Sequence, residues 1–197
     1  MTKQILAAYD DEGVYVYQAF RPEIVQAALQ DGTFGGGGFK MERMTWIKPS
    51  FGWMLYRAGY AMKEHQQNIV KIKLSHAGFR QALKWGVLST WNPNVYESEG
   101  EWQRDVKKSP VRIQWDPDRS LKGGKIGRRA IQIGLRGKAV YAYINEWIIG
   151  LEDVTALAHR IGELKRAKKP IEVNVPDERV YPVEAEIMHR LGMDSPG

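Results

Sequence analysis

The chain has 197 residues, of which 43% are hydrophobic and 26% are charged. One domain over residues 1–197 is expected, because domains usually hold roughly 100 to 200 residues, and the composition excludes disordered and fibrous classes. The absence of cysteine excludes disulfides, thiolate nucleophiles and cysteine-ligated zinc. The formal net charge of +6 favours an anionic partner such as a nucleotide or a nucleic acid, although a mildly basic charge also serves solubility alone.

Metal binding and membrane insertion are not expected. The four histidines are scattered, with no pair four residues apart and no HExxH sequence, whereas metal ligands usually leave a local spacing pattern. No apolar run approaches the ~18 residues of a membrane helix, and the amino-terminal residues lack the apolar stretch of a secretory signal. The sequence therefore predicts a cytoplasmic protein without a metal and without membrane contact.

Predicted strands and helices follow one another irregularly along the chain. Strands are indicated by β-branched and aromatic runs or by alternation, and helices by helical apolar spacing between proline starts and glycine ends. The expected strands are 14–20, 44–47, 68–74, 111–115, 130–135, 147–151 and 171–175, and the expected helices are 22–31, 50–62, 76–85, 138–146, 155–169 and 183–191. Long surface loops are expected at 90–108 and 119–129. Because this order is not a regular βαβ repeat, we predict an α+β fold with a mostly antiparallel sheet and flanking helices.

Residues 43–57 mix side-chain types in a way that indicates a binding surface. They interleave two tryptophans, a phenylalanine and a tyrosine with three cations and two hydroxyls. Aromatic faces stack on bases and on a nicotinamide ring, while arginine and lysine bind phosphates. The alternative is that the aromatic residues simply belong to the core and the cations lie outside it.

A second basic stretch runs from 119 to 129, and no acidic residue falls between Asp118 and Glu146. Cations on a glycine-rich loop can follow a polyanion, and such contacts weaken with salt. The candidate nucleic-acid-binding residues are Lys122, Lys125, Arg128 and Arg129. The alternative is an ordinary solvated loop.

Candidate acids and bases are few. Asp116 and Asp118 flank Pro117, as residues that form a turn would. Glu152 and Asp153 precede the helix expected at 155, where negative charge is favourable in any case. The Gly-x-Ser-x-Gly sequence of a nucleophile elbow is absent, which disfavours a hydrolase.

Several segments together resemble a domain-of-unknown-function family that carries an RMTWIKPSF-like signature. The matching segments are 17–20, 43–56, 114–117, 131–135 and 147–153, which span nearly the whole chain. Membership of that family implies no activity by itself.

A looser similarity is to the small ADP-ribosyltransferase core, in the order of its strands and helices. This resemblance implies a split sheet and NAD as substrate, with no metal. It implies that Gln18 contacts the ribose, Lys48 and Arg57 hold the pyrophosphate, and Trp46 and Tyr56 flank the nicotinamide or base. Thr45 and Ser50 complete the nucleotide-binding set, and the catalytic set is Gln132, Glu152 and Tyr56.

Two positions depart from the ADP-ribosyltransferase pattern. Gln18 stands where a histidine or arginine is usual, and Gln132 stands where the catalytic glutamate is usual, with Glu152 as the other candidate for that role. A glutamine can hydrogen-bond a ribose hydroxyl but is not a general base. The departures therefore bear on catalysis more than on nucleotide binding.

Two functions follow from these patterns. The first is an ADP-ribosyltransferase-like enzyme that binds NAD or another nucleotide and modifies a nucleic acid or a protein. The alternative is a non-catalytic nucleic-acid-binding module that uses the basic loop and exposed aromatic residues.

Overall fold

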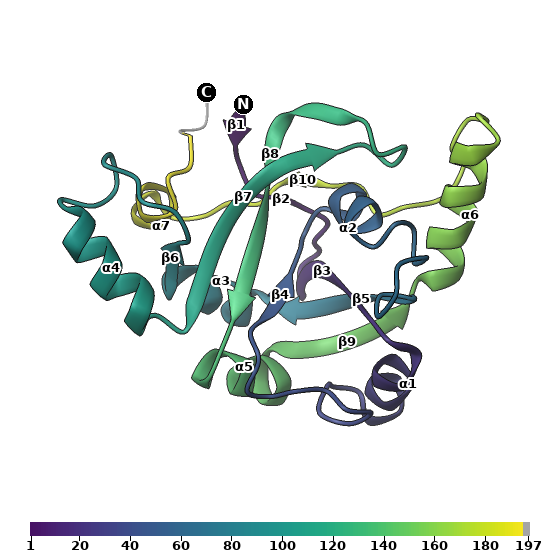
Figure 1. Ribbon diagram of the computed structural model, residues 1–197, viewed down its shortest axis with the longest axis horizontal. Coiled ribbons are helices and arrows are strands. Elements are labelled where there is room, and N and C mark those ends of the chain that lie inside the picture. The colour runs from purple at the N-terminus through teal and green to yellow at the C-terminus, as the bar shows by residue number, and fades with distance from the viewer. Residues whose placement is uncertain (195–197) are drawn as a thin grey trace.

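The computed structural model describes residues 1–194 and has the expected α+β fold (Figure 1). The first sheet has the order β1-β8-β7-β6, and β4 also pairs with β8. Its strands are β1 (Thr2–Lys3), β4 (Thr45–Ile47), β6 (Gly86–Leu88), β7 (Val111–Arg119) and β8 (Lys125–Leu135). The β7–β8 and β4–β8 pairs are antiparallel, and the β1–β8 and β6–β7 pairs are parallel. The sheet is therefore mixed and built around the long β7–β8 hairpin.

A second, fully antiparallel sheet crosses below the hairpin in Figure 1. It has the order β3-β5-β9, formed by β3 (Gly13–Phe20), β5 (Asn68–Ser75) and β9 (Ile148–Asp153). A short antiparallel pair, β2 (Leu6–Ala7) with β10 (Arg179–Val180), ties the amino-terminal segment to the carboxy-terminal one.

The two larger sheets meet at Lys48. The Tyr17 N–H of β3 donates to the Lys48 carbonyl at 2.8 Å, and the Lys48 N–H donates back to the Tyr17 carbonyl at 3.2 Å. One residue earlier, Ile47 is still paired with Ile133 of β8. The chain therefore leaves the first sheet for the second at Lys48, and the sheet is split there.

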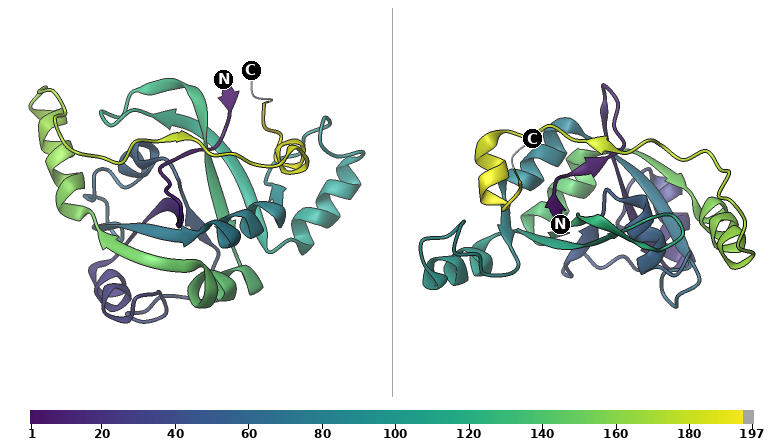
Figure 2. Two further views of the ribbon diagram at one scale, coloured as in Figure 1. Left: turned by 180° about the vertical axis from the view of Figure 1, so that it is seen from behind. Right: turned by 90° about the horizontal axis from the view of Figure 1, so that it is seen from above.

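The helices pack around these sheets, with α4 and α6 at opposite ends of the long axis (Figures 1 and 2). They are α1 (Pro22–Asp31), α2 (Phe51–Arg57), α3 (His76–Lys84), α4 (Glu99–Lys108), α5 (Lys138–Ala142), the π-helical turn η1 (Tyr143–Trp147), α6 (Thr155–Arg166) and α7 (Ala185–Arg190). Within the described part of the chain, no helix has both the length and the apolar character needed to cross a bilayer.

Apolar residues on the inner faces of both sheets form the main core. Val16 and Ile72 from one sheet and Ile113 and Ile133 from the other belong to the same buried cluster. A second cluster lies around α2 and α6 and includes Leu55. Because the apolar residues of β7 and β8 face this core, the alternate residues of those strands lie on the outer face of the sheet.

Both loops predicted from the sequence are wrong in part, and in the second of them residues 125–129 belong to β8. Residues 99–108, expected to be loop, form α4, whose first turn is capped by the Ser98 hydroxyl accepting from the Glu101 N–H. The Trp102 indole N–H donates to the Leu88 carbonyl and holds the helix against β6. Acidic residues at its start and lysines at its end suit the helix dipole, and this polar composition resembled that of a loop.

The boundaries of one strand and one helix also differ from prediction, and one predicted strand does not form. The strand expected at 111–115 continues to Arg119 because Pro117 lies at an irregularity in the β7–β8 pairing, where proline is tolerated. The helix expected at 50–62 ends at Arg57, since Tyr60 and Ala61 take positive φ angles. The expected edge strand at 171–175 is absent, and the segment runs without regular structure.

The packing of α3 on η1 generates a stability prediction at Gly78. A Cβ atom there would lie 2.5 Å from Cγ of Trp147, so Gly78→Ala should lower the free energy of unfolding by about 1–3 kcal/mol. Gly100→Ala in α4 is the matched control, because its Cβ would meet nothing nearer than 3.7 Å. Urea unfolding of both variants checks this, and equal stability of the two would contradict the packing.

Candidate functional site

Polar side chains gather on the outer face of the first sheet. Gln114 and Asp116 of β7 alternate with core residues, and Gln132 of β8 is paired directly with Gln114. Continuing the β4–β8 register by one residue would set Lys48 opposite Gln132. Because the chain turns toward β3 at that point, space opens between Lys48 and the polar face of the hairpin.

Helix α2 covers this space and makes it a pocket of about 550 Å³. Trp46 and Lys48 come from β4 and the residue after it, Trp53, Tyr56 and Arg57 from α2, Gln66 from the loop before β5, and Gln114, Asp116 and Gln132 from the hairpin. The volume lies within the range of roughly 300–1,000 Å³ that is typical of small-molecule sites.

Lys48 has an unusual environment in this pocket. Its side chain is only 7% exposed, and within residues 1–194 its amine forms one long hydrogen bond, 3.4 Å to the Trp46 carbonyl, and no ion pair. Burial, together with the nearby Arg57 charge and against the pull of Asp116, lowers the pKa of the amine from 10.5 to about 8. The amine thus has donor capacity that no protein acceptor uses.

Asp116 is the carboxylate of the pocket and is held in place by two amides. The Gln114 Nε2 donates to its Oδ1 at 3.0 Å, and the Gln132 Nε2 donates to its Oδ2. These amide donors on neighbouring strands fix the orientation of the carboxylate. A negative group is therefore held in the same pocket as Lys48 and Arg57.

Aromatic rings form the helical wall of the pocket. Trp53 and Tyr56 stack with centroids 5.6 Å apart and planes 23° apart, and the Arg119 guanidinium lies 3.9 Å above the Tyr56 ring. The indole N–H of Trp53 is buried without a hydrogen-bond partner in the described residues. On the sheet side, the Trp46 ring covers Gly134, where a Cβ would lie 3.0 Å from it.

The residues predicted to bind the nucleotide or to act in catalysis divide into two groups. Trp46, Lys48, Tyr56, Arg57 and Gln132 line the pocket together.

Gln18 and Thr45 lie beneath the pocket instead. The Gln18 Nε2 donates to the Thr45 hydroxyl at 2.6 Å and to the Trp46 carbonyl at 3.1 Å, and the Tyr143 hydroxyl donates to its Oε1 at 2.7 Å. With Gln18 only 3% exposed, this network supports β4 from below.

Ser50 and Glu152 also lie outside the pocket. The Ser50 hydroxyl accepts from the Trp53 N–H as the amino-terminal cap of α2 and donates to Asp118 at 2.6 Å. It therefore anchors α2 to the hairpin. Glu152 lies on β9, pairs with Lys71 and lines a different, smaller cavity.

The predicted nucleic-acid-binding residues lie along the hairpin. Lys122 and Lys125 are exposed near its tip, whereas Arg128 donates to the buried Asp118 at 2.6 Å. Thr2 and Lys3 pair with Arg128 and Arg129. Two of the four cations are thus exposed, whereas Arg128 links the two strands of the hairpin and also pairs with Glu178 at 3.8 Å.

The sequence interpretation missed Asp116, Gln114, Trp53 and Gln66 as pocket residues. Asp116 precedes a proline, which is typical of a turn, and this pattern ends the predicted strand at Trp115, too early. The detectable signal was alternation, because Gln114 and Asp116 are polar residues two apart on a strand whose neighbours are apolar. Gln66 had no comparable signal, since only the fold brings its loop to the pocket.

The network beneath the pocket generates a stability prediction. Tyr143→Phe removes the donor to Gln18 Oε1 in a buried site and should lower the free energy of unfolding by about 1–3 kcal/mol, because the amide oxygen loses its partner. Tyr141→Phe is the matched control, since Tyr141 is 61% exposed. Chemical denaturation of the pair measures the difference, and equal losses would refute a supporting role for Gln18.

Comparison with known proteins places the chain in a family. No curated protein matches it. Residues 4–181 match the domain of unknown function DUF4291, a range that includes the second sheet, the first sheet except β1, and every residue of the pocket. The chain belongs to the DUF4291 family.

Proposed function

We propose that the pocket binds NAD and that the protein is an ADP-ribosyltransferase-like enzyme that transfers ADP-ribose to a nucleic acid or protein acceptor. One observation carries this proposal: a buried lysine amine, which within residues 1–194 has one long hydrogen bond and no ion pair, lines a cavity that is also walled by three aromatic rings. Buried polar groups nearly always have hydrogen-bond partners in proteins, so the amine suits an anionic ligand with acceptor atoms. The aromatic walls suit a ligand that also carries a flat ring.

The cations suit a pyrophosphate. Lys48 offers unused N–H donors inside the pocket, and Arg57 lines the same wall. The buried Trp53 indole N–H is a further donor without a partner in residues 1–194. Arginine and lysine are the usual phosphate ligands of proteins, and Lys48 lines the pocket from the sheet side and Arg57 from the helix side.

The aromatic residues suit the rings of a dinucleotide. Trp46 lies on the sheet side of the cavity, and Trp53 and Tyr56 lie on the helix side. Stacking of a base on an aromatic side chain contributes about 1–3 kcal/mol. A planar ring between these walls places the attached ribose near the polar face of the hairpin.

Asp116 is the group we assign to catalysis. In ADP-ribosyl transfer the bond from ribose C1′ to the nicotinamide nitrogen breaks, nicotinamide leaves with the bonding electrons, and an acceptor atom bonds to C1′. A fixed carboxylate stabilises the positive charge that develops on the ribose and accepts the proton that the acceptor loses. Gln132, expected in the catalytic position, is a positioning residue here because it donates to Asp116.

A non-catalytic nucleic-acid-binding module is the second candidate. The exposure of Lys122 and Lys125 near the hairpin tip supports it. It requires no ligand in the pocket, so NAD binding separates the two candidates.

Lys48→Met should change stability and binding in opposite directions. Burying the Lys48 ammonium lowers the free energy of unfolding, and this loss is complete below the folded-state pKa of about 8 and disappears as the pH rises toward 10.5. The methionine variant carries no buried charge, so it should have a higher Tm than the wild type at pH 7. It should also lose the thermal shift that NAD produces. In the wild type, the NAD affinity should fall as the pH rises through 8, because the amine loses its charge.

Differential scanning fluorimetry with and without NAD measures both effects. Lys71→Met is the matched control, because Lys71 pairs with Glu152 outside the pocket and its loss should leave the NAD shift unchanged. An undiminished NAD shift in Lys48→Met, or no shift in the wild type, would contradict the proposal.

Asp116→Asn should separate chemistry from binding. The asparagine keeps the shape of the side chain but loses the negative charge, so transfer should fall by about 10²-fold or more while the NAD thermal shift remains. Mass spectrometry of acceptors incubated with NAD measures the adducts. Glu152→Gln, in the separate cavity, should retain activity. Activity retained in Asp116→Asn and lost in Glu152→Gln would contradict the assignment and indicate Glu152 as the catalytic carboxylate.

A further inference from the structure

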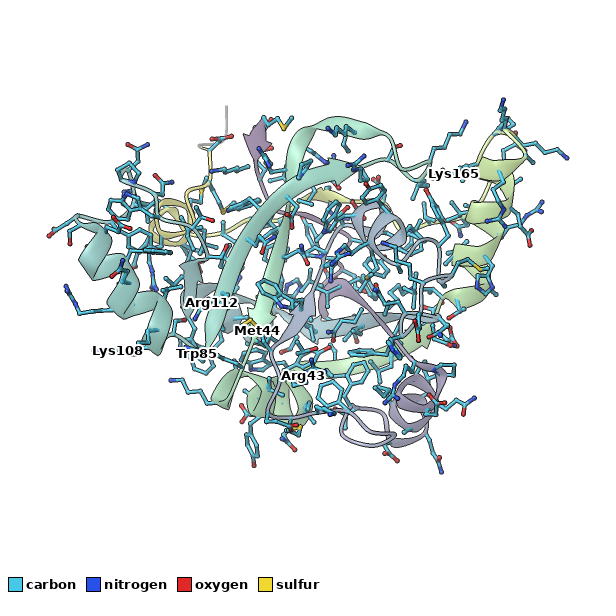
Figure 3. All side chains as sticks on the ribbon, in the orientation of Figure 1. Arg43, Met44, Trp85, Lys108, Arg112 and Lys165 are labelled. Atoms are coloured by element: carbon cyan, nitrogen blue, oxygen red, sulfur yellow. The ribbon has the colours of Figure 1, made fainter. Side chains whose placement is uncertain are left out.

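A second cavity, of about 530 Å³, lies at the amino-terminal side of β4. Its walls come from the end of β3, the start of α1, the segment that leads into β4, and the loop before β5. The lining side chains that matter here are Phe20, Arg21, Phe39, Lys40, Arg43 and Met44. Figure 3 shows Arg43 and Met44 beside the start of β4.

The cations of this groove are not used by the protein itself. Arg21, Lys40 and Arg43 are all exposed, and within residues 1–194 none of the three has a side-chain hydrogen bond or an ion pair. By contrast, Arg128, Lys71 and Lys73 are each paired with carboxylates. Within the described residues, the groove thus presents three positive charges without an ion pair, one at the start of α1 and two in the segment before β4.

The same groove also has an aromatic element. Phe20 is partly exposed and is held by an edge contact to Phe39, with centroids 5.8 Å apart. Its ring and the Met44 side chain provide apolar surface between the cations. Proteins that bind single-stranded nucleic acids combine cations, which contact the phosphates, with aromatic rings, which stack on the bases.

Neighbouring residues of two segments line the two cavities. Thr45 lines the groove, and its neighbour Trp46 lines the first pocket. His65 and its neighbour Gln66 are divided in the same way. A strand bound in the groove would therefore lie next to β4 and the loop before β5, the two segments that also line the pocket with Lys48 and Asp116.

We propose that this groove binds the acceptor, a single-stranded nucleic acid whose phosphates contact Arg21, Lys40 and Arg43 and whose base stacks on Phe20. The proposal rests on the proposed function, because it names the acceptor of that same site. An oxygen or nitrogen atom of the strand bonds to ribose C1′, nicotinamide leaves, and the displaced proton passes to Asp116. The hairpin cations, expected from the sequence to bind nucleic acid, are then peripheral.

The test compares charge reversal in the groove with charge reversal on the hairpin. Fluorescence anisotropy with labelled single-stranded DNA and RNA is measured on the wild type, on Arg21→Glu/Lys40→Glu/Arg43→Glu, and on the control Lys122→Glu/Lys125→Glu/Arg129→Glu. The groove variant should bind at least about 10-fold more weakly and should reduce the slope of log affinity against log salt by about 2–3. The control should keep most of the wild-type affinity.

Two measurements keep the outcomes distinct. The thermal midpoint and the NAD shift of each variant show whether it is folded and whether the first pocket is intact, and Arg21→Gln/Lys40→Gln/Arg43→Gln is used if the triple reversal unfolds. Loss of binding in the groove variants with the NAD shift retained supports the inference. Unchanged oligonucleotide binding in those variants, loss only in the hairpin control, or no binding by the wild type overturns it while leaving NAD binding standing.

Discussion

The departure of the chain from β8 at Lys48 is the constraint on which the rest of the structure depends. Its backbone pairs with Tyr17 of β3 instead of continuing along β8, and this exchange both joins the two sheets and leaves the polar face of the hairpin uncovered beside them. Helix α2 then begins at once, because Ser50 caps it and ties it to Asp118. The pocket is thus the space between the outer face of the β7–β8 hairpin and helix α2. It forms because the chain leaves β8 at Lys48 and begins α2 only three residues later.

This arrangement buries the Lys48 amine, although burying a charged amine does not favour folding. A lysine amine with one long hydrogen bond is costly to bury, and the supporting network of Gln18, Thr45 and Tyr143 fixes the strand that carries it. Local rules of stability are usually violated at functional sites. The opposing carboxylate, Asp116, is likewise held by amides rather than by a salt bridge, so both charges remain available to a ligand.

The sequence predicted the α+β class, most strands and the segment that forms one wall of the pocket, because periodicity and turn residues are local signals. Helix α4 was missed because its polar surface resembled that of a loop. The polar, pocket-lining face of β7 was missed because Pro117 is typical of a turn, although the pairing with β8 tolerates a proline there. From the sequence, Gln18 and Lys48 were equally good candidates for residues that contact the nucleotide. Only the tertiary structure shows that the first is buried in a satisfied network and that the second faces a cavity.

The most direct measurement is a titration of the Lys48 side-chain amine by nitrogen-15 NMR, with and without ADP-ribose. A buried amine that serves as a phosphate ligand should titrate near pH 8 in the free protein and at a higher pH with ADP-ribose bound, because a phosphate stabilises its charged form. A midpoint near the ordinary value of 10.5 that ADP-ribose leaves unchanged would contradict both the burial of the amine and its role in binding.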